Sequence, residues 1–339
     1  MQLKELIMSL CSISGPSGYE TKVREYLYEY FSAFTQDIHT DALGNLWAIH
    51  RCGIPDAPLL MLDAHMDEIG LVVTSVEDGF LRFAPLGGVD ARLLPAREVR
   101  IMTDPPLFGV IDTMPVHILK DGEEDTAIET DKLCIDIGMS RENAEKAVPL
   151  GTPVVFTGGC TELGDDCLCG KALDDRACVA ILLSAFERLC AIERMTDICC
   201  LISTQEELGC RGATTATWSI HPDYAIAVDV THAKTPDAKE VLTDAGKGAA
   251  IGVGPNMNAA FTKLLFAAAE RNGIPYQTEV CPGESGTNAE VIQISGCGVA
   301  TALVSLPEKY MHTPCETARL EDAQAVCDLL VAVAAEMEA

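Results

Sequence analysis

Five short segments of the chain combine carboxylates and histidines with apolar, strand-like sequence. They are MLDAHMDEIG (61–70), ALDDRA (172–177), STQEELG (203–209), AVDVTHA (227–233) and KYMHTPCE (309–316). Carboxylate oxygens and imidazole nitrogens are ligands that divalent zinc, cobalt or manganese accept in proteins. A pair of such ions needs about five of these side chains, with one shared between the ions. Together the segments therefore predict a two-metal hydrolase site.

The first two segments each offer a pair of candidate side chains. His65 and Asp67 lie two residues apart at the end of an apolar run, so both can face one side, with His65 binding metal and Asp67 supporting its imidazole. A surface hydrogen-bonding pair is the competing interpretation. Asp174 and Asp175 open a predicted helix, where consecutive carboxylates stabilise the helix N-terminus even without a metal.

The remaining candidates follow or interrupt apolar runs. Glu206 and Glu207 are adjacent, so in an extended chain they point to opposite sides, and one can bind metal while the other acts on water. A solvated helix start explains this pair equally well. Asp229 lies within AIAVDVT, where an unpaired charge is costly. On the residues alone, His312 fits a loop or core histidine as well as a ligand.

The elements that must position these residues alternate between helix and strand. Apolar residues at helical spacing predict helices at 3–11, 20–34, 174–190, 259–273 and 319–337. Buried strands are predicted at 45–50, 58–65, 197–204, 224–231 and 299–307, with the first two as neighbours. This alternation predicts an α/β fold with a mixed, largely parallel sheet sandwiched by helices and functional groups at the strand ends.

A helix-poor stretch separates the two parts of this pattern. It contains the runs IGLVVTSV, FLRFAPLG, REVRIMT, LFGVIDT and KLCIDIG. Runs of Val, Ile, Phe and Thr that are split by Gly, Pro and Asp are typical of barrels or sandwiches. We therefore predict a small, β-barrel-like domain at 68–163, inserted into an α/β domain formed by residues 1–67 and 164–339.

Composition limits the partners and the compartment. The net charge is −27, from 24 Lys and Arg against 51 Asp and Glu, and it disfavours nucleic acids and anionic membranes as partners. No apolar run approaches the roughly 18 residues that span a bilayer, and we expect the N-terminal residues not to act as a secretory leader. We expect a cytoplasmic protein whose 15 cysteines are free thiols.

In order and wording, several motifs resemble those of one family, the dinuclear metallo-aminopeptidases. The motifs are DAHMDEIG, GKALDDRAC, QEELGCRGA, VDVTHA, GKGAAIG and YMHTPCE, and the resemblance covers essentially the whole chain. This family includes bacterial glutamyl aminopeptidases and tetrahedral, dodecameric archaeal aminopeptidases, and some members carry the name endoglucanase. The resemblance implies a zinc-exopeptidase-like fold and an enzyme that releases N-terminal residues from short peptides.

The resemblance also implies a role for each candidate metal ligand. Asp174 is expected to bridge two divalent ions per subunit, with zinc or cobalt preferred and manganese possible. His65 and Asp229 would complete the site of one ion. Glu207 and His312 would complete the site of the other. Two ions that share a carboxylate lie roughly 3.5–4 Å apart, lower the pKa of a water and polarise the scissile carbonyl.

Two catalytic residues and an assembly follow from the same resemblance. Asp67 is expected to orient His65, and Glu206 is expected to act as the general base that takes the water's proton and passes it to the leaving amine. The insertion is expected to join subunits into a dimer or a dodecamer. Asn288 stands in GESGTNAE where the family often has an aspartate, which puts a pocket or supporting contact in question.

Two other function classes stay open at this point. A glycoside hydrolase such as an endoglucanase acting on β-glucan would use paired carboxylates without metal, and chelators would not affect it. A non-catalytic binding or assembly protein of the same fold would be marked by lost ligands. The preferred N-terminal residue and the physiological metal do not follow from the sequence.

Overall fold

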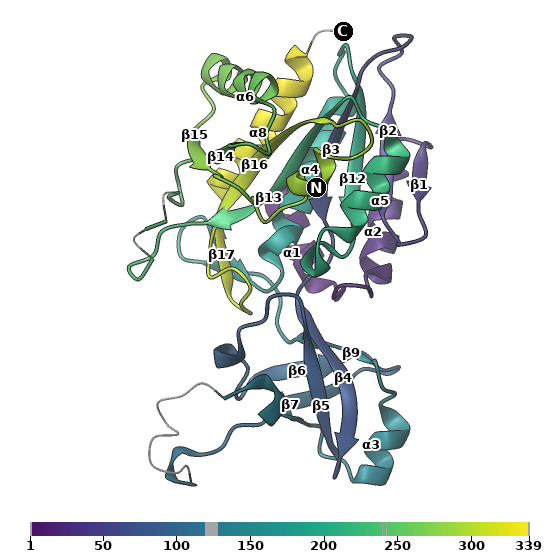
Figure 1. The fold of residues 1–339 in the computed structure, drawn as a ribbon, viewed down its shortest axis with the longest axis vertical. Helices are drawn as coiled ribbons and strands as arrows, with labels where there is room; N and C mark the ends of the chain where they lie inside the picture. Colours follow the sequence, from purple (N-terminus) through teal and green to yellow (C-terminus); the bar gives the residue numbers. More distant parts are fainter. Residues whose placement is uncertain (1, 119–127, 239, 242, 338–339) are drawn as a thin grey trace.

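The computed structural model describes residues 2–118, 128–238, 240–241 and 243–337. Figure 1 shows an upper unit, in which helices pack on both sides of a large sheet, and a smaller β-rich unit below it. Among the described helices, none has both the length and the apolar composition needed to cross a membrane. The predicted α/β fold with an inserted barrel is confirmed by the strands described next.

In the described residues, a mixed sheet of eleven strands forms the upper unit. Its strands are β1 (Ile38–Thr40), β2 (Leu46–His50), β3 (Leu59–His65), β10 (Thr161–Leu163), β11 (Cys167–Gly170), β12 (Asp197–Ser203), β13 (Tyr224–His232), β14 (Ala249–Val253), β15 (Tyr276–Val280), β16 (Ala300–Lys309) and β17 (Glu316–Arg319). They follow the order β1-β2-β12-β3-β13-β16-β17-β11-β10, with β14 pairing with β16 and β15 with β14. The central strands β12, β3, β13 and β16 are mutually parallel.

One predicted pairing in this sheet is wrong. The strands β2 and β3 were expected to be neighbours, but β12 lies between them, antiparallel to β2 and parallel to β3. Every residue of β12 is buried. This apolar strand removes most surface from water in the middle of the sheet, where neighbouring strands cover both of its edges and helices cover both of its faces. Closeness in the sequence therefore does not decide which strands pair.

Helices cover both faces of the large sheet. The helices of the upper unit are α1 (Leu3–Ser12), α2 (Thr21–Phe31), α4 (Leu173–Cys190), α5 (Arg211–Ile220), α6 (Ala259–Asn272), α7 (Ala289–Ile292) and α8 (Leu320–Glu336), and the short 3-10 helix η4 (Glu206–Leu208) follows β12. Apolar residues of α1, α2, α4, α6 and α8 share one core, and those of α5 and α7 share a second core on the opposite face. Sequence analysis predicts neither α5 nor α7. The ten residues of α5 include three Thr and one Gly, which form helices weakly, and α7 has only four residues.

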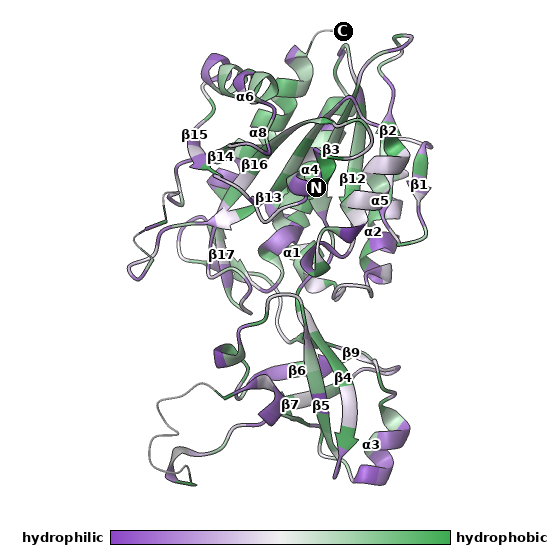
Figure 2. Ribbon diagram, in the orientation of Figure 1, coloured by the Kyte–Doolittle hydropathy of each residue, from purple (hydrophilic) through white to green (hydrophobic). Residues whose placement is uncertain are grey.

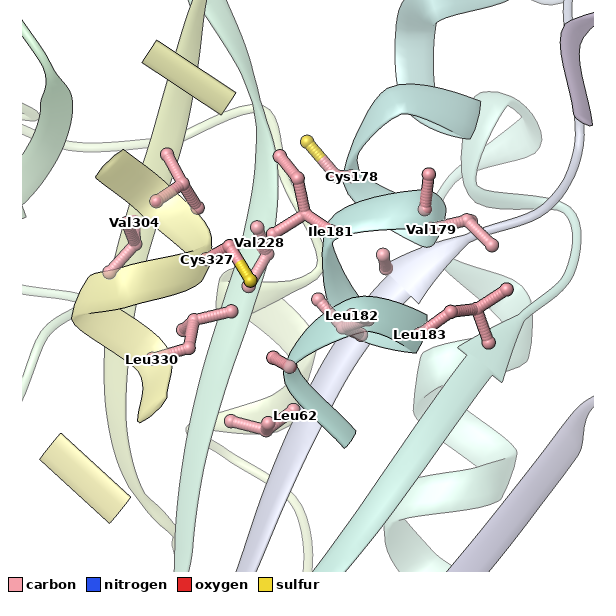
Figure 3. Packing of buried hydrophobic residues seen from close by; sticks show 14 of the residues in the cluster. Leu62, Cys178, Val179, Ile181, Leu182, Leu183, Val228, Val304, Cys327 and Leu330 are labelled. Carbon is pink, nitrogen blue, oxygen red and sulfur yellow. The ribbon is translucent and has the colours of Figure 1, made fainter. Parts of the chain in front are cut away.

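Strand β3 shows how alternation assigns side chains to the two faces. Leu60, Leu62 and Ala64 belong to the core on the α4 side, whereas Met61 belongs to the core on the α5 side. Figure 3 shows Leu62 near Leu182 of α4 and other apolar side chains of this core. Figure 2 shows the matching hydropathy, with hydrophobic central strands. The alternation puts His65, the last residue of β3, on the same face as Met61.

The lower unit is a closed barrel in the order β4-β5-β8-β7-β6-β9. Its elements are β4 (Gly70–Glu77), β5 (Phe80–Leu86), η1 (Ala91–Leu93), β6 (Glu98–Ile101), β7 (Leu107–Ile111), η2 (Val116–Ile118), η3 (Thr130–Lys132), β8 (Ile135–Asp136), α3 (Arg141–Ala147) and β9 (Pro153–Phe156). A separate apolar core fills it. The strand β10 extends the large sheet, although its residues fall in the predicted insertion 68–163. The division into domains 1–67 with 164–339 and 68–163 stays a prediction.

Candidate active site

The predicted site residues come together around one cavity of about 220 Å³. Five of them line it, namely His65, Asp174, Glu206, Asp229 and His312. They come from the end of β3, the start of α4, η4, the middle of β13 and the loop after β16. The parallel strands β12, β3, β13 and β16 bring most of these segments to one edge of the sheet, as the sequence predicts.

The buried imidazole of His65 lies between two carboxylates. Its Nδ1 lies 3.3 Å from Oδ1 of Asp67, and its Nε2 lies 3.2 Å from Oδ1 of Asp174. Only 1% of His65 is exposed, so its orientation is fixed by these neighbours. The Asp67 contact favours a proton on Nδ1, which leaves the Nε2 lone pair for a ligand.

His312 approaches the other oxygen of the same aspartate. Its Nε2 lies 3.1 Å from Oδ2 of Asp174 and 3.3 Å from Oε1 of Glu207. Its Nδ1 lies 3.1 Å from the carbonyl oxygen of Gly88, and because a carbonyl only accepts, Nδ1 carries the proton. A Cβ at Gly88 would come within 2.6 Å of this Nδ1, so glycine leaves room for the imidazole. Sequence analysis missed the role of this glycine.

Within the part of the chain that the structure describes, two groups of three side chains have ligand atoms within 4.8 Å of one another. One group is His65, Asp174 and Glu207, which joins the predicted bridging aspartate to one ligand predicted for each ion. The other is His65, Asp175 and Asp229, so Asp229 lies close to Asp175 as well. Oδ2 of Asp175 also accepts the backbone N–H of His65 at 3.1 Å. Sequence analysis considered Asp175 only as part of an acidic pair and gave it no separate role.

The carboxylate of Asp67 also holds the two adjacent glutamates. Its oxygens accept the backbone N–H groups of Glu206 at 3.0 Å and of Glu207 at 3.3 Å, and the hydroxyl of Ser17 at 2.6 Å. Four groups from three segments, including the His65 ring, therefore converge on one buried side chain. Asp67 thereby couples the position of His65 to that of η4.

A second supporting carboxylate, Glu316, was quoted within KYMHTPCE but given no role. Its oxygens accept the backbone N–H of Asp174 at 3.2 Å and that of His312 at 3.0 Å. Glu316 is 1% exposed and lies at the start of β17. Its two bonds fix the backbone of two candidate ligands at once, a relationship that no local pattern predicts.

The electrostatics of the cluster show an excess of negative charge. Burial opposes protonation of His312, but the Asp174 and Glu207 carboxylates outweigh it and raise its pKa to about 11. Burial likewise opposes protonation of His65, yet its carboxylate neighbours raise its pKa well above the usual value. Burial raises the pKa of Glu206 to about 7, against the influence of His65 and with that of Glu207. A buried cluster that draws protons onto its histidines has the charge and donor atoms that suit divalent cations.

Asn288 lies beside this site and binds a different carboxylate. Its side-chain nitrogen donates to Oδ2 of Asp63 at 2.8 Å and to Oγ of Ser203 at 2.9 Å. Asn288 is not among the described residues that line the cavity, although its neighbour Thr287 is. The amide therefore supports buried Asp63, for which burial raises the pKa to about 6.

The chain combines a mixed sheet, a buried His, Asp and Glu cluster beside its parallel strands, and a closed barrel, and its family match makes it a peptide hydrolase. The chain belongs to the M42 glutamyl aminopeptidase family, whose sequence model matches residues 44–329. The predicted family and the predicted peptide-hydrolysing enzyme are thereby confirmed. The assignment favours a peptidase over the glycoside hydrolase and non-catalytic alternatives.

Individual proteins resemble the chain over nearly its full length. A lysyl aminopeptidase of Pyrococcus furiosus is 36% identical, covering 98% of this chain and 97% of that protein. The structure of an aminopeptidase from Desulfurococcus kamchatkensis is 34% identical with a TM-score of 0.92, covering 99% of this chain and 95% of that one. The Pyrococcus horikoshii TET1 peptidase, described as assembling into a tetrahedron or an octahedral shell, is 32% identical with a TM-score of 0.88, covering 99% and 100%.

Proposed function

We propose that this protein is an aminopeptidase that releases N-terminal residues from short peptides and uses two divalent metal ions per subunit. One observation carries the proposal. The two carboxylate oxygens of Asp174 face different histidines, with Oδ1 3.2 Å from His65 and Oδ2 3.1 Å from His312. A carboxylate flanked in this way has the geometry of a shared ligand between two ions.

The donor set fits zinc or cobalt best and manganese as an alternative. Both histidines direct Nε2 toward Asp174, and the contacts at Nδ1 keep that nitrogen protonated. We assign Glu207 to the ion on the His312 side, because its Oε1 lies 3.3 Å from that ring. We assign Asp229 to the ion on the His65 side, where Asp175 is also close.

Glu206 is our candidate for the general base. It lines the cavity, its Oε2 lies 4.0 Å from Nε2 of His65, and it falls outside both groups of close ligand atoms. When bound, divalent ions polarise the scissile carbonyl and make a water more acidic. A carboxylate that is free to change its protonation state then takes a proton from water and passes it to the leaving amine. Asp67 holds this glutamate's backbone in place.

The test of this function is hydrolysis of aminoacyl-p-nitroanilides before and after metal removal. We expect a chelator to abolish turnover, and zinc, cobalt or manganese to restore it to different extents. Cleavage of a β-glucan that survives chelation would instead support a glycoside hydrolase. Full peptidase turnover in protein shown by elemental analysis to be metal-free would refute the metal-dependent proposal.

We also propose that the chain self-associates into a dimer or, by analogy with the tetrahedral relative, a dodecamer, with the barrel unit making subunit contacts. Exposed Phe80 and Phe108 on β5 and β7 give that unit apolar surface. Light scattering at several concentrations should show a large assembly that shrinks when the barrel is removed. A monomer at all concentrations would contradict this proposal. A cytoplasmic location stays a prediction.

A further inference from the structure

A carboxylate without an assigned role lines the same cavity as the candidate ligands. Glu279 lies in β15, and its two oxygens each accept one hydroxyl. Oε1 accepts from Thr231 at 2.5 Å, and Oε2 accepts from Ser305 at 2.8 Å. These bonds fix the carboxylate in a single orientation, and each oxygen keeps a further lone pair.

No cation in the described part of the chain neutralises this carboxylate. Glu279 forms no ion pair with any described residue, and the described residues that line the cavity include no lysine or arginine. The hydroxyls of Thr231 and Ser305 orient the charge without cancelling it. A fixed and half-buried anion in a small cavity is stabilised by a ligand that brings its own positive charge.

The position of Glu279 relative to the proposed metal site suits a basic side chain. Thr231 follows Asp229 by two residues on β13, so both side chains lie on one face, and Ser305 of β16 lies directly opposite Asp229. Two residues along a strand span about 6.6 Å. An extended lysine side chain covers about 6 Å between Cα and Nζ, given bonds of about 1.5 Å. A lysine whose α-amine lies beside Asp229 can therefore place its ammonium group near Glu279.

Apart from the proposed metal-binding and catalytic residues, no other described residue that lines the cavity places a charged side chain beside Glu279. Ser285, Thr287 and Met311 are neutral. His232 is the remaining titratable group apart from the proposed catalytic and metal-binding residues, and it follows Thr231 in the strand. Alternation turns it to the opposite face from Thr231, where it is exposed. The fixed negative charge is thus the distinguishing feature of this part of the cavity.

We propose that Glu279 selects peptides whose N-terminal residue is lysine or arginine. This specificity rests on the aminopeptidase function proposed above. A basic side chain would form a charge-assisted hydrogen bond with the carboxylate, whereas an N-terminal glutamate would meet a like charge in a partly desolvated site. Neutral side chains would occupy the cavity without either effect.

The test compares Lys-, Arg-, Leu- and Glu-p-nitroanilide with the metal-loaded wild type and three variants. We expect the wild type to prefer Lys and Arg over Leu in kcat/KM by about tenfold or more. Glu279→Gln should lower the Lys-to-Leu ratio by about 10- to 100-fold, chiefly through KM. Glu279→Asp, which keeps the charge, should retain more of that ratio than the amide. Glu284→Gln removes the same charge from an exposed position in the neighbouring loop and should keep the wild-type ratio.

The outcomes separate this proposal from the function on which it rests. A wild type that cleaves Leu or Glu substrates faster than Lys substrates would overturn the specificity while leaving the aminopeptidase intact. Glu279→Gln could instead lower kcat/KM equally for the Lys and Leu substrates, with Glu279→Asp no better than the amide. That result would show that the carboxylate has only a structural role and would also overturn the proposed specificity. Metal content and circular dichroism of each variant establish that the comparison is between folded, loaded proteins. A wild type that cleaves none of the four substrates would refute the aminopeptidase function itself.

Discussion

The carboxylate of Asp67 lies behind the imidazole of His65, with Oδ1 3.3 Å from Nδ1, on the opposite side of the ring from Asp174. The same carboxylate accepts the backbone N–H groups of Glu206 and Glu207. Burial opposes ionisation of Asp67, but its contacts with His65 and its other hydrogen-bond donors lower its pKa. An ionised Asp67 therefore fixes a proposed metal ligand and the proposed base together.

Replacing Asp67 by asparagine should weaken metal binding by about 10- to 100-fold, because the amide cannot support the imidazole with a negative charge. Metal titration followed by elemental analysis measures this change. Asp322 is a suitable control, since it is also buried but accepts the N–H groups of Gly246 and Gly248 outside the cavity. Equal metal affinity in Asp67→Asn and the wild type would contradict the proposal that Asp67 supports His65 as a metal ligand.

Replacing Glu206 by glutamine should lower kcat by about 100- to 10,000-fold while both metal ions stay bound, because an amide cannot accept the proton from water. Single-turnover assays on metal-loaded protein separate the chemical step from product release. The neighbour provides a matched contrast, since Glu207→Gln should lose metal from the His312 side. A Glu206→Gln protein with wild-type kcat would assign the base to another residue.

Replacing Asp174 by asparagine should reduce the occupancy of both ions, since this one carboxylate faces both histidines. Asp229→Asn should reduce the occupancy of one ion and spare the other. The measurement is the number of ions per chain after dialysis against a fixed concentration of free metal. Two ions per chain in Asp174→Asn would exclude a shared ligand at this position.

Replacing Asn288 by aspartate should destabilise the fold, because its side-chain nitrogen donates to buried Asp63 and an acid would place two carboxyl groups there. We expect the free energy of unfolding to fall by about 1–3 kcal/mol near neutral pH. When folding raises the pKa of a carboxyl group, the folded protein becomes less stable as the pH rises from the group's unfolded pKa, about 3.9, to its folded pKa. The loss of unfolding free energy in Asn288→Asp should therefore be larger at pH 8 than at pH 5. Urea unfolding titrations of the variant and the wild type at each pH measure this difference.

The same substitution at Asn258 controls for the chemical change itself. Asn258 is an exposed residue that caps α6 by accepting the N–H groups of Ala260 and Phe261, and aspartate caps a helix equally well. Asn258→Asp should leave stability close to that of the wild type at both pH values. An Asn288→Asp protein as stable as this control would show that the pocket tolerates a second acid.

The elements of the fold follow closely from the sequence. The helix at 174–190 was predicted from apolar spacing and forms as Leu173–Cys190, and the strand at 224–231 forms as Tyr224–His232. Local periodicity predicts such elements well because burying one face requires apolar residues at the matching spacing. The β-rich stretch likewise predicted a barrel, since its short runs and turn residues carry that information locally.

By itself, the sequence determined which residue types could form the site, because His65, Asp174 and His312 stand out as polar groups in or beside apolar runs. Tertiary structure alone decided that the two oxygens of Asp174 face different histidines and that Gly88, from the loop after β5, meets His312. It also decided that Glu279 joins the same cavity. The contacts of Asp174 and of Gly88 depend on packing between segments more than 100 residues apart, such as the 224 residues between Gly88 and His312. Periodicity records which face of an element is buried, and only the folded chain determines what that face meets.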